Sequence, residues 1–381
     1  MFSLPTVQFT DEQEQFRLEV RAFLQEHLAK GTFKTKCDSW LSGSDPAFSK
    51  LIGEQGWIGL TWPKKYGGQE RSTIDRYILT EEFLAVGAPV AAHWFADRQT
   101  GPLLMRFGTE EQREFFLPKI VKGECYFGIG LSEPNSGSDL ASVKTRAEKV
   151  DGGWIINGSK TWTSNAHDAH YAVTLIRTEP LGEKKHEGLS QLIIDLHAEG
   201  VTIVPIKYLT GEHHFNEVFF DNVFVPDNMV VGTLGNGWKQ GLAELAFERS
   251  GPERILSTFP LLDELIAELK RQGDAAGMKE ASKVLSRLWG LRNLSIGVAK
   301  VLEEGGEVAI PAALVKSIGT KFEQSIPEIT RLLVRTYPRL EAERRIDRFM
   351  AESTLHAPGF TIRGGTSEVL YGMVAKGVVG Q

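Results

Sequence analysis

Several features that mark secreted, metal-binding or membrane-spanning chains are scarce in this sequence. Cysteine occurs only twice, as Cys37 and Cys125, far apart and without metal-ligand spacing. We expect both thiols to be buried in a protein of a reducing compartment. No run of about 18 apolar residues is present, so no transmembrane helix is expected, and the N-terminus lacks the basic and apolar regions of a signal peptide. A cytoplasmic protein without membrane insertion is therefore predicted.

Lysine and arginine together are slightly fewer than aspartate and glutamate. The formal net charge is −6 over 381 residues, which disfavours a nucleic-acid-binding protein because such proteins carry a basic face. The remaining composition, 41% hydrophobic and 24% charged, is that of a globular protein. A chain of this length exceeds one simple core, so we expect two or three domains.

The first segment, residues 1–125, has the periodicity of helices. Thr10 precedes an acidic stretch and predicts a helix N-cap, after which apolar residues recur with the helical period. The stretch 109–112, Thr-Glu-Glu-Gln, resembles a capping box, in which the first and last side chains bond each other's backbone amides. A helical N-terminal domain is expected here.

The residue pattern changes from helical to strand-like at residue 126 and returns to helical near residue 236. Residues 126–235 contain short runs rich in Val, Ile, Phe and Tyr between Gly, Asn and Asp, which predict strands and turns. Within them, Asn157-Gly158 predicts a hairpin turn, and residues 181–188 an exposed loop. Helical periodicity returns over 236–381. The predicted fold is mainly α with a β middle domain and a C-terminal helical bundle.

Two polar clusters in the middle segment are candidate ligand sites. The loop LSEPNSGSD (131–139) crowds hydroxyls and amides around a turn, which fits either an anion or heterocycle site or a capped loop. In NGSKTWTSNA (157–166), Trp162 is either a platform for a flat ring system, with hydroxyls beside it, or a structural tryptophan.

A third stretch, TIRGGTSEV (361–369), joins two glycines to two hydroxyls and a carboxylate. By itself it is either an ordinary turn or a ligand-binding loop in which Glu368 is an acid.

Together with GWIGLTWPKKYGG (56–68) and FDNVFVPDNMVVG (220–232), these stretches resemble motifs of the acyl-CoA dehydrogenase family, in the same order and over essentially the whole chain. The resemblance implies an N-terminal helical domain (1–125), a β-barrel-like middle domain (126–235) and a C-terminal four-helix bundle (236–381). It also implies FAD as cofactor, an acyl-CoA substrate, and electron-transfer flavoprotein or a similar acceptor as electron-accepting partner.

The resemblance assigns residues to the cofactor and to the substrate. The implied flavin contacts are Leu131, Ser132, Gly137, Ser138, Trp162, Thr163, Ser164, Thr366 and Glu368. The implied substrate contacts are Ser138, Arg249, Gly364 and Gly365.

The reaction of this family is α,β-desaturation, in which a carboxylate removes the α-proton and the β-hydrogen leaves as hydride to the flavin. Many members place the catalytic glutamate at the position of Gly364, which has no side chain. A minority branch places it in an L-x-x-E-R context, which this chain matches at Glu248. No cation lies three or four residues from Glu248, so a surface helical ion pair does not explain it, and Glu248 is the expected base.

Two family motifs that reach a neighbouring subunit's FAD, R-x-x-F-G and Q-x-x-G-G, have no match in residues 267–277 and 344–359. A paralogous subunit supplying that half-site, in an α2β2 heterotetramer, is one interpretation, and a homo-oligomer with diverged contacts is the other. The sequences around residues 245–255 and 210–226 further resemble those of α-type subunits of bacterial steroid side-chain acyl-CoA dehydrogenases. An absent side chain at position 364 is consistent with room for a bulky acyl group.

Three other functions compete with a dehydrogenase. A non-catalytic or regulatory subunit of a heteromeric flavoprotein would not need Glu248. A DNA-associated flavoprotein of the same superfamily is disfavoured by the acidic balance. An acyl-CoA oxidase would release peroxide, although such chains are usually longer.

Overall fold

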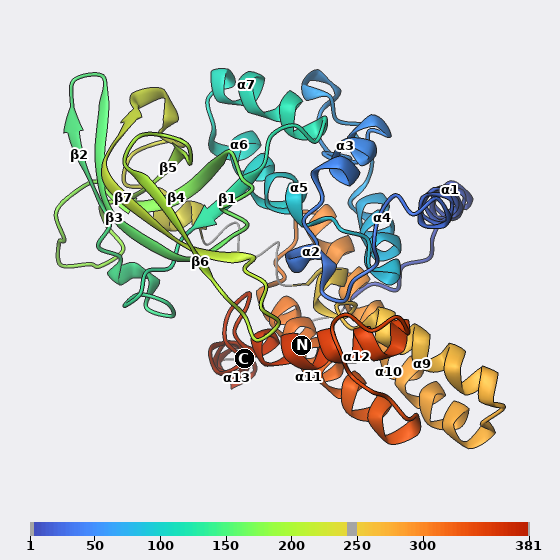
Figure 1. Cartoon of the computed structure of the whole chain (residues 1–381). Coiled ribbons are helices and arrows are strands. Elements are labelled where there is room, and N and C mark those ends of the chain that lie inside the picture. Colours follow the sequence, from blue (N-terminus) through green and yellow to red (C-terminus); the bar gives the residue numbers. More distant parts are fainter. Residues whose placement is uncertain (1–3, 242–249, 380–381) are drawn as a thin grey trace. The chain divides into compact units, whose positions relative to one another are not determined.

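The structure, a computed structural model, describes residues 4–241 and 250–379 (Figure 1). The described residues divide into two compact units. The first comprises residues 4–43, 71–89 and 250–379, and the second comprises residues 44–70 and 90–241. Helices of the first 125 residues are therefore shared between both units, and the predicted boundaries at residues 125 and 235 stay a prediction.

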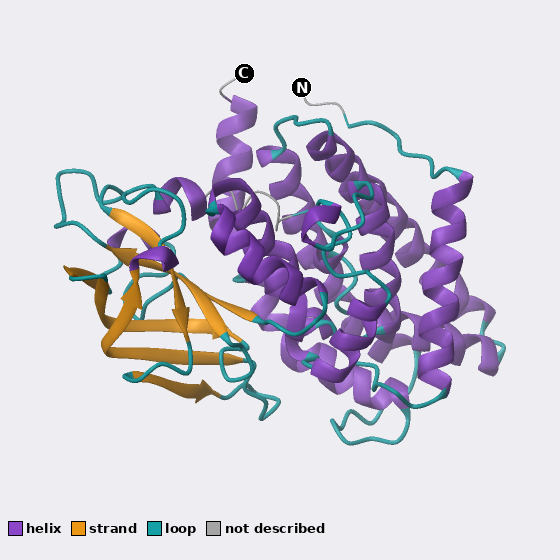
Figure 2. Cartoon of the chain, turned by 90° about the horizontal axis from the view of Figure 1, so that it is seen from above, coloured by secondary structure: helices purple, strands orange, loops and turns teal. Residues whose placement is uncertain are grey.

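The second unit is built around one mixed sheet, drawn in orange in Figure 2. Its described strands are β1 (Phe127–Gly130), β2 (Arg146–Val150), β3 (Gly153–Ser164), β4 (Tyr171–Arg177), β5 (Leu189–Asp195), β6 (Val201–Ile206) and β7 (Phe215–Pro226). They run in the order β1-β4-β2-β3-β7-β6, and β5 also pairs with β4. The β1–β4 pair is parallel, whereas β2–β3, β3–β7, β4–β5 and β6–β7 are antiparallel.

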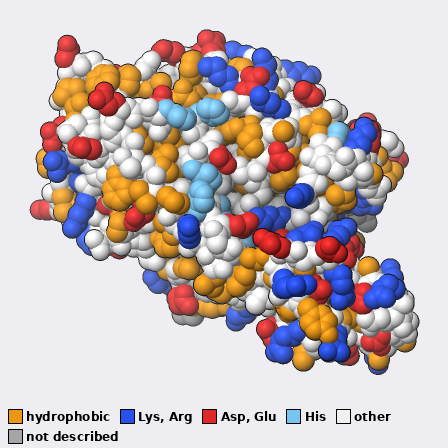
Figure 3. Space-filling view, in the orientation of Figure 1, with side chains coloured by type: hydrophobic (Ala, Val, Ile, Leu, Met, Phe, Trp, Pro, Cys, Tyr) orange, Lys and Arg blue, Asp and Glu red, His pale blue; other side chains and the backbone are white. Residues whose placement is uncertain are grey.

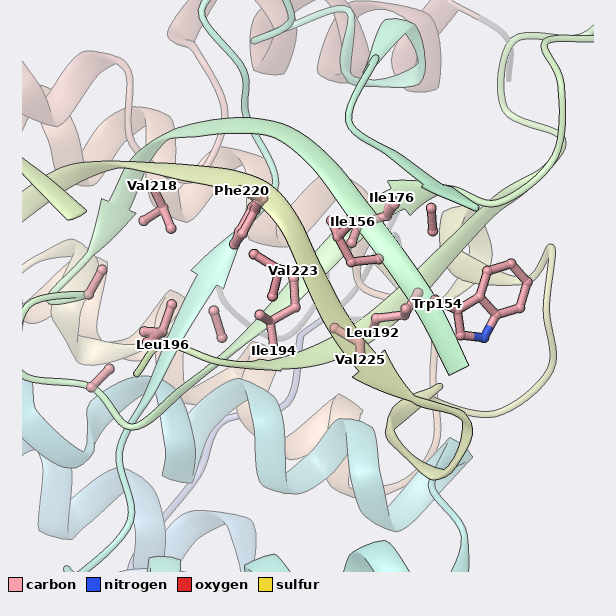
Figure 4. Close-up of a cluster of buried hydrophobic side chains, with 14 of the residues drawn as sticks. Trp154, Ile156, Ile176, Leu192, Ile194, Leu196, Val218, Phe220, Val223 and Val225 are labelled. Atoms are coloured by element: carbon pink, nitrogen blue, oxygen red, sulfur yellow. The ribbon is translucent and has the colours of Figure 1, made fainter. Parts of the chain in front are cut away.

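One face of this sheet carries the unit's main hydrophobic core (Figure 4). Trp154 and Ile156 of β3 point into it, as do Phe220 and Val223 of β7. The inward positions of β7 change from even to odd numbers between these last two residues because Asn222, with φ 55°, is an extra residue opposite Asn157. A β-bulge therefore keeps both halves of a long strand facing one core.

The Asn157-Gly158 prediction of a hairpin turn is wrong. Both residues lie inside β3, opposite the bulge, where the Asn222 amide donates to Oδ1 of Asn157 at 3.0 Å. Gly158 is required there because a Cβ would lie 2.7 Å from the Cα of Thr145. The hairpin turn between β2 and β3 falls instead at Asp151-Gly152, and Gly152 has φ 72°.

Helices complete the second unit. Those whose two ends are described are α3 (Pro46–Glu54), α5 (Ala91–Phe95), α6 (Gly101–Phe107) and α7 (Glu110–Val121), and residues 237–241 are also helical. Helix α5 continues into a π-helical turn, Ala96–Thr100. The predicted capping box at the start of α7 is confirmed, since Thr109 and Gln112 exchange side-chain-to-backbone hydrogen bonds of 3.1 and 3.2 Å. The loop predicted over 181–188 is exposed at residues 181–187.

The first unit is helical. Its described helices are α1 (Asp11–Ala29), α2 (Ser39–Ser42), α4 (Thr73–Val86), α9 (Phe259–Gln272), α10 (Ala275–Glu303), α11 (Ala309–Leu333), α12 (Arg345–His356) and α13 (Ser367–Val379), with 3₁₀ turns at Pro252–Arg254 and Ala357–Thr361. Thr10 caps α1 as predicted. The helices α9 to α12 pack against one another, and α13 packs on α11. The predicted fold class, mainly α with a β middle domain and C-terminal helices, is confirmed.

The surface and the thiols agree with the composition. Lysine and arginine are interspersed with aspartate and glutamate on the face shown in Figure 3. Cys37 and Cys125 are both buried, as expected, and burial raises the pKa of the Cys125 thiol to about 12. Among residues 4–241 and 250–379, no helix combines the length and apolar character needed to span a bilayer.

Candidate functional site

The polar loop 131–139 follows β1 and is tied to β3. The Thr161 amide donates to the carbonyl oxygen of Ser132 at 2.9 Å, so the loop runs directly beside the residue that precedes Trp162. Glu133 and Ser136 close a tight turn by exchanging two backbone hydrogen bonds of 3.0 Å. The structure thus brings together two of the clusters that the sequence had marked separately.

Most of the predicted flavin contacts in this loop are accessible. Leu131 and Ser132 are half-buried, whereas Gly137 and Ser138 are exposed. A Cβ added at Gly137 would meet nothing within 4 Å. The tip of the loop therefore presents backbone amides and a hydroxyl to whatever approaches it.

A buried ion pair supports the loop from behind. Nζ of Lys160, a fully buried side chain, donates to Oε1 of Glu133 at 2.8 Å and to the Leu131 carbonyl at 3.2 Å. The same carboxylate accepts the backbone amides of Lys144 at 2.7 Å and Thr145 at 2.9 Å. Both carboxylate oxygens of Glu133 therefore accept hydrogen bonds from within the unit, and the pair fixes the course of the loop.

The ionisation of this pair follows from its surroundings. Burial raises the pKa of Glu133, but the charge of Lys160 and the hydrogen bonds from Lys160 and the backbone outweigh it, so the pKa lies below its usual value. Burial lowers the pKa of Lys160 to about 8, against the opposing pull of Glu133. Both groups are therefore charged at neutral pH.

Trp162 stands at a strained position of β3. Lys160 pairs with Val218 and Thr163 pairs with Asn216, which leaves one residue too many on β3. Trp162 takes up the excess with φ 60°, a conformation that is a genuine outlier for a bulky side chain. The residue is 52% exposed, more than the other exposed aromatic residues described in this unit, Phe224, Phe115 and Phe219, at 49%, 44% and 40%. Strained residues cluster at active sites and ligand contacts, so Trp162 stays a candidate contact for a ring system.

The two hydroxyl residues after Trp162 are buried. Thr163 and Ser164 are 1% and 7% exposed. Within the part of the chain that the structure describes, the buried Oγ1 of Thr163 has no hydrogen-bond partner. A buried hydroxyl without a protein partner is a place for a ligand or water to bond.

The third predicted cluster lies in the first unit, between the 3₁₀ turn Ala357–Thr361 and α13. Gly364 and Gly365 have φ 66° and 98°, a region that glycine alone enters freely. Thr366 caps α13, because its Oγ1 accepts the Val369 amide at 3.3 Å. Glu368 is exposed in the first turn of that helix. The four residues form one compact loop-to-helix element.

A buried ionic network, which we call the Asp38 network, lies beneath this loop. It comprises Asp38, Ser257, Glu323, His356 and Arg363. The Arg363 guanidinium donates to Oδ1 of Asp38 and, at 2.8 Å, to Oγ of Ser257, and it lies 3.5 Å from Glu323. His356 lies 3.7 Å from Asp38. Burial raises the pKa of Glu323 to about 7.

Two guanidinium groups flank Trp40 next to this network. Arg363 and Arg254 lie 4.9 and 5.0 Å from the centroid of the indole. A Cβ at Gly364 would stand 2.9 to 3.2 Å from Nη2, Cζ and Nη1 of the Arg254 guanidinium. On the side where a Cβ would point, the neighbour of Gly364 is therefore Arg254, and the room for a bulky acyl group expected from the sequence stays a prediction.

The remaining predicted site residues, Glu248 and Arg249, lie outside the described residues. Sequence reasoning missed the supporting residues Glu133, Lys160, Asp38, Arg254 and Arg363. Glu133 and Lys160 lay inside the quoted motifs, and for Lys160 the available signal was a charged residue inside a predicted strand. Asp38 and Arg363 had no such signal, because their partners are distant in the chain.

Comparisons with known proteins agree with this geometry. Residues 10–124 match the acyl-CoA dehydrogenase N-terminal domain, and residues 128–223 match the middle domain. The acyl-CoA dehydrogenase IpdE1 of Mycobacterium tuberculosis is 34% identical, with 96% of this chain and 97% of that protein covered.

Two solved structures are similar over their full length. The Tcur3481-Tcur3483 steroid ACAD superposes with a TM-score of 0.86 at 28% identity, covering 98% of both chains. The ChsE4-ChsE5 complex from Mycobacterium tuberculosis gives a TM-score of 0.82 at 27% identity, covering 99% of both. The chain belongs to the acyl-CoA dehydrogenase family and is an oxidoreductase that acts on CH–CH bonds.

Proposed function

We propose that this protein is an FAD-dependent dehydrogenase that introduces an α,β double bond into an acyl-CoA thioester. The observation that carries the proposal is the β3 bulge. It exposes the ring of Trp162 and, one residue later, buries a Thr163 hydroxyl without a partner among the described residues. A flat heterocycle with a polar edge suits this pair of features.

The residues present fit FAD. Trp162 would lie beside the ring system, Thr163 and Ser164 would bond its polar edge, and Leu131, Ser132, Gly137 and Ser138 would hold it from the loop. In the first unit, Thr366 and Glu368 are the proposed contacts to the remainder of the cofactor. When bound, the flavin supplies the two-electron acceptor for the hydride that leaves the β-carbon.

The protein's own part in the reaction is to take the α-proton. Glu248, which lies outside the described residues, is the proposed base, and Arg249, Gly364, Gly365 and Ser138 are proposed substrate contacts. A carboxylate shielded from water has a raised pKa, which suits proton abstraction near neutral pH. Gly364 and Gly365 have no acidic side chain, so neither can act as the base.

A bulky or branched acyl group, such as a steroid side chain, is proposed as substrate. Its support is the resemblance to a protein described as a steroid ACAD, 28% identical over nearly the whole chain. The ChsE4-ChsE5 neighbour is described as a complex, which supports a paralogous partner subunit in an α2β2 assembly. Electron-transfer flavoprotein or a similar acceptor is proposed to reoxidise the flavin in a cytoplasmic enzyme.

The test is expression of the chain alone and together with a paralogous subunit, with native mass and flavin absorbance recorded. Anaerobic addition of straight, branched and steroid acyl-CoAs should bleach the flavin. Glu248→Gln should retain flavin and lose bleaching. Bleaching that persists in Glu248→Gln would remove this residue from the mechanism, and a wild-type protein that binds flavin but responds to no thioester would favour a non-catalytic subunit. Peroxide release during turnover would identify an oxidase.

A further inference from the structure

The pairing of Gly364 with Arg254 has a consequence for specificity. A Cβ at position 364 would lie 2.9 Å from Nη2, 3.0 Å from Cζ and 3.2 Å from Nη1 of Arg254. Contacts this short are tighter than nearly all real Cβ contacts, and the φ of 66° adds strain for any residue other than glycine. The arginine head group and a side chain at position 364 compete for the same volume.

Arg254 has little freedom to retreat. Its side chain is 2% exposed, and its backbone belongs to the 3₁₀ turn Pro252–Arg254, where its amide donates to the Gly251 carbonyl at 3.0 Å. The turn is pressed against α11, because a Cβ at Gly319 would collide with the Arg254 carbonyl oxygen. The guanidinium itself lies against the Trp40 ring.

Trp40 is in turn held by the same network that holds the loop. Its Nε1 donates to Oγ of Ser257 at 3.2 Å, and that hydroxyl also accepts from Arg363, the residue before Gly364. Arg254, Trp40 and Arg363 therefore form a continuous packed layer under the two glycines. Moving the arginine would require rearranging a buried charged layer rather than rotating one exposed side chain.

We propose that Arg254 is the positioning and specificity-determining residue of this loop, closing the volume beside Gly364 and holding the Gly364-Gly365 backbone in its left-handed conformation. The inference rests on the proposed function in one respect, that this loop borders the acyl group. It follows that the glycine at position 364 exists to admit Arg254 and not the acyl group. Shortening Arg254 should open space for branching next to the thioester.

The experiment is a double-mutant cycle on the flavin-loaded protein, co-purified with its partner subunit where the assembly requires one. The variants are Gly364→Ala, Arg254→Ala and the pair combined, with Arg271→Ala as matched control, because Arg271 is an exposed arginine paired only locally with Glu268. Thermal unfolding and FAD dissociation are measured for each. Gly364→Ala is strained by its φ in both backgrounds, so it should weaken FAD binding in both, but about fivefold more in the parent than in Arg254→Ala. Equal effects of Gly364→Ala on FAD binding in the parent and in Arg254→Ala would overturn the proposal.

A second measurement separates specificity from stability. The ratio of kcat/KM for a 2-methyl-branched over a straight-chain acyl-CoA should rise about tenfold in Arg254→Ala. It should stay near the parent value in Arg254→Lys, which retains a long cationic side chain, and in Arg271→Ala. An unchanged ratio in Arg254→Ala would contradict the specificity role. If the parent acts on no acyl-CoA, the proposed function fails, while the coupling in unfolding and FAD binding still tests Arg254.

Discussion

The two loops that carry the predicted cofactor residues are supported in different ways. The loop 131–139 rests on one ion pair, Glu133–Lys160, whose members are 27 residues apart. The loop 362–366 rests on the Asp38 network, in which Arg363 bonds a partner 325 residues away and contacts two more groups. When Lys160 is lost, Glu133 keeps two backbone amides as partners but loses its ion pair. When Asp38 is lost, Arg363 keeps a hydroxyl and a second carboxylate. The two sites should therefore respond differently to the loss of a charge.

The largest effect is expected from the single pair. Lys160→Met leaves Glu133 buried without its cation, which should lower the free energy of unfolding by about 3 to 5 kcal/mol. Urea denaturation measures this loss. Lys149→Met is the control, because Lys149 forms an exposed pair with Asp227 and should change stability by less than about 1 kcal/mol. Equal losses in both variants would show that the buried pair does not support the loop.

The double variant Lys160→Met/Glu133→Gln tests whether the loss of stability comes from the unpaired charge of Glu133. It removes both charges, so no unpaired ion remains in the interior, and part of the lost stability should return. A double variant less stable than Lys160→Met would mean that the hydrogen bonds from Lys144 and Thr145 to the carboxylate outweigh the penalty of the uncompensated charge.

Between about pH 5 and pH 7 the network should show a pH dependence of stability that the single pair does not, because the pKa of Lys160 is about 8 and that of Glu133 lies below its usual value. Burial raises the pKa of Glu323 from 4.5 to about 7. The folded protein then binds more protons than the unfolded chain between these values, so stability falls as the pH rises through this window and levels off above it. The full effect is up to about 3 kcal/mol.

Glu323→Gln tests that dependence directly, since glutamine imitates the protonated acid. The stability of the variant relative to the parent should increase from about pH 5 to about pH 7, measured by denaturant unfolding at each pH. A difference that stays constant over this range would show that Glu323 is ionised in the fold, in which case it is a full ionic partner of Arg363.

Asp38→Asn should have a smaller effect than Lys160→Met, although both remove a buried charge. Arg363 keeps Ser257 and Glu323 as partners, and asparagine tolerates the φ of 54° at position 38. A loss of about 2 kcal/mol is expected, with Asp227→Asn as the exposed control. A loss equal to that of Lys160→Met would remove the distinction between network and pair.

This contrast also explains what sequence could and could not predict. The caps at Thr10 and Thr109 were found because a capping box lies within four residues. The strands were found because alternation and β-branched residues are local signals. The bulge opposite Asn157 was not found, since its cause is Asn222, 65 residues away on another strand.

The candidate site shows the same limit. Trp162 and its neighbours were located from their own motif, and the structure added the reason, a bulge that strains and exposes the ring. The neighbour of Gly364, Arg254, could not be predicted, because it comes from a 3₁₀ turn far away in the sequence, beyond the reach of a local pattern. Contacts of this kind depend on tertiary packing, which a local pattern does not encode.

The smallest effect concerns Thr366, for which two roles compete. Its hydroxyl caps α13 by accepting the Val369 amide, and it is also a proposed contact to the cofactor. Loss of a cap lowers stability by about 1 kcal/mol, so Thr366→Ala should lower the thermal midpoint slightly whether or not flavin is bound. Thr366→Ser retains the hydroxyl, so its thermal midpoint and its FAD binding should match those of the parent protein. If Thr366→Ala weakens FAD binding while the flavin-free protein unfolds as the parent does, the hydroxyl serves the cofactor; if flavin-free stability alone falls, Thr366 is a helix cap and the loop binds its ligand through other groups.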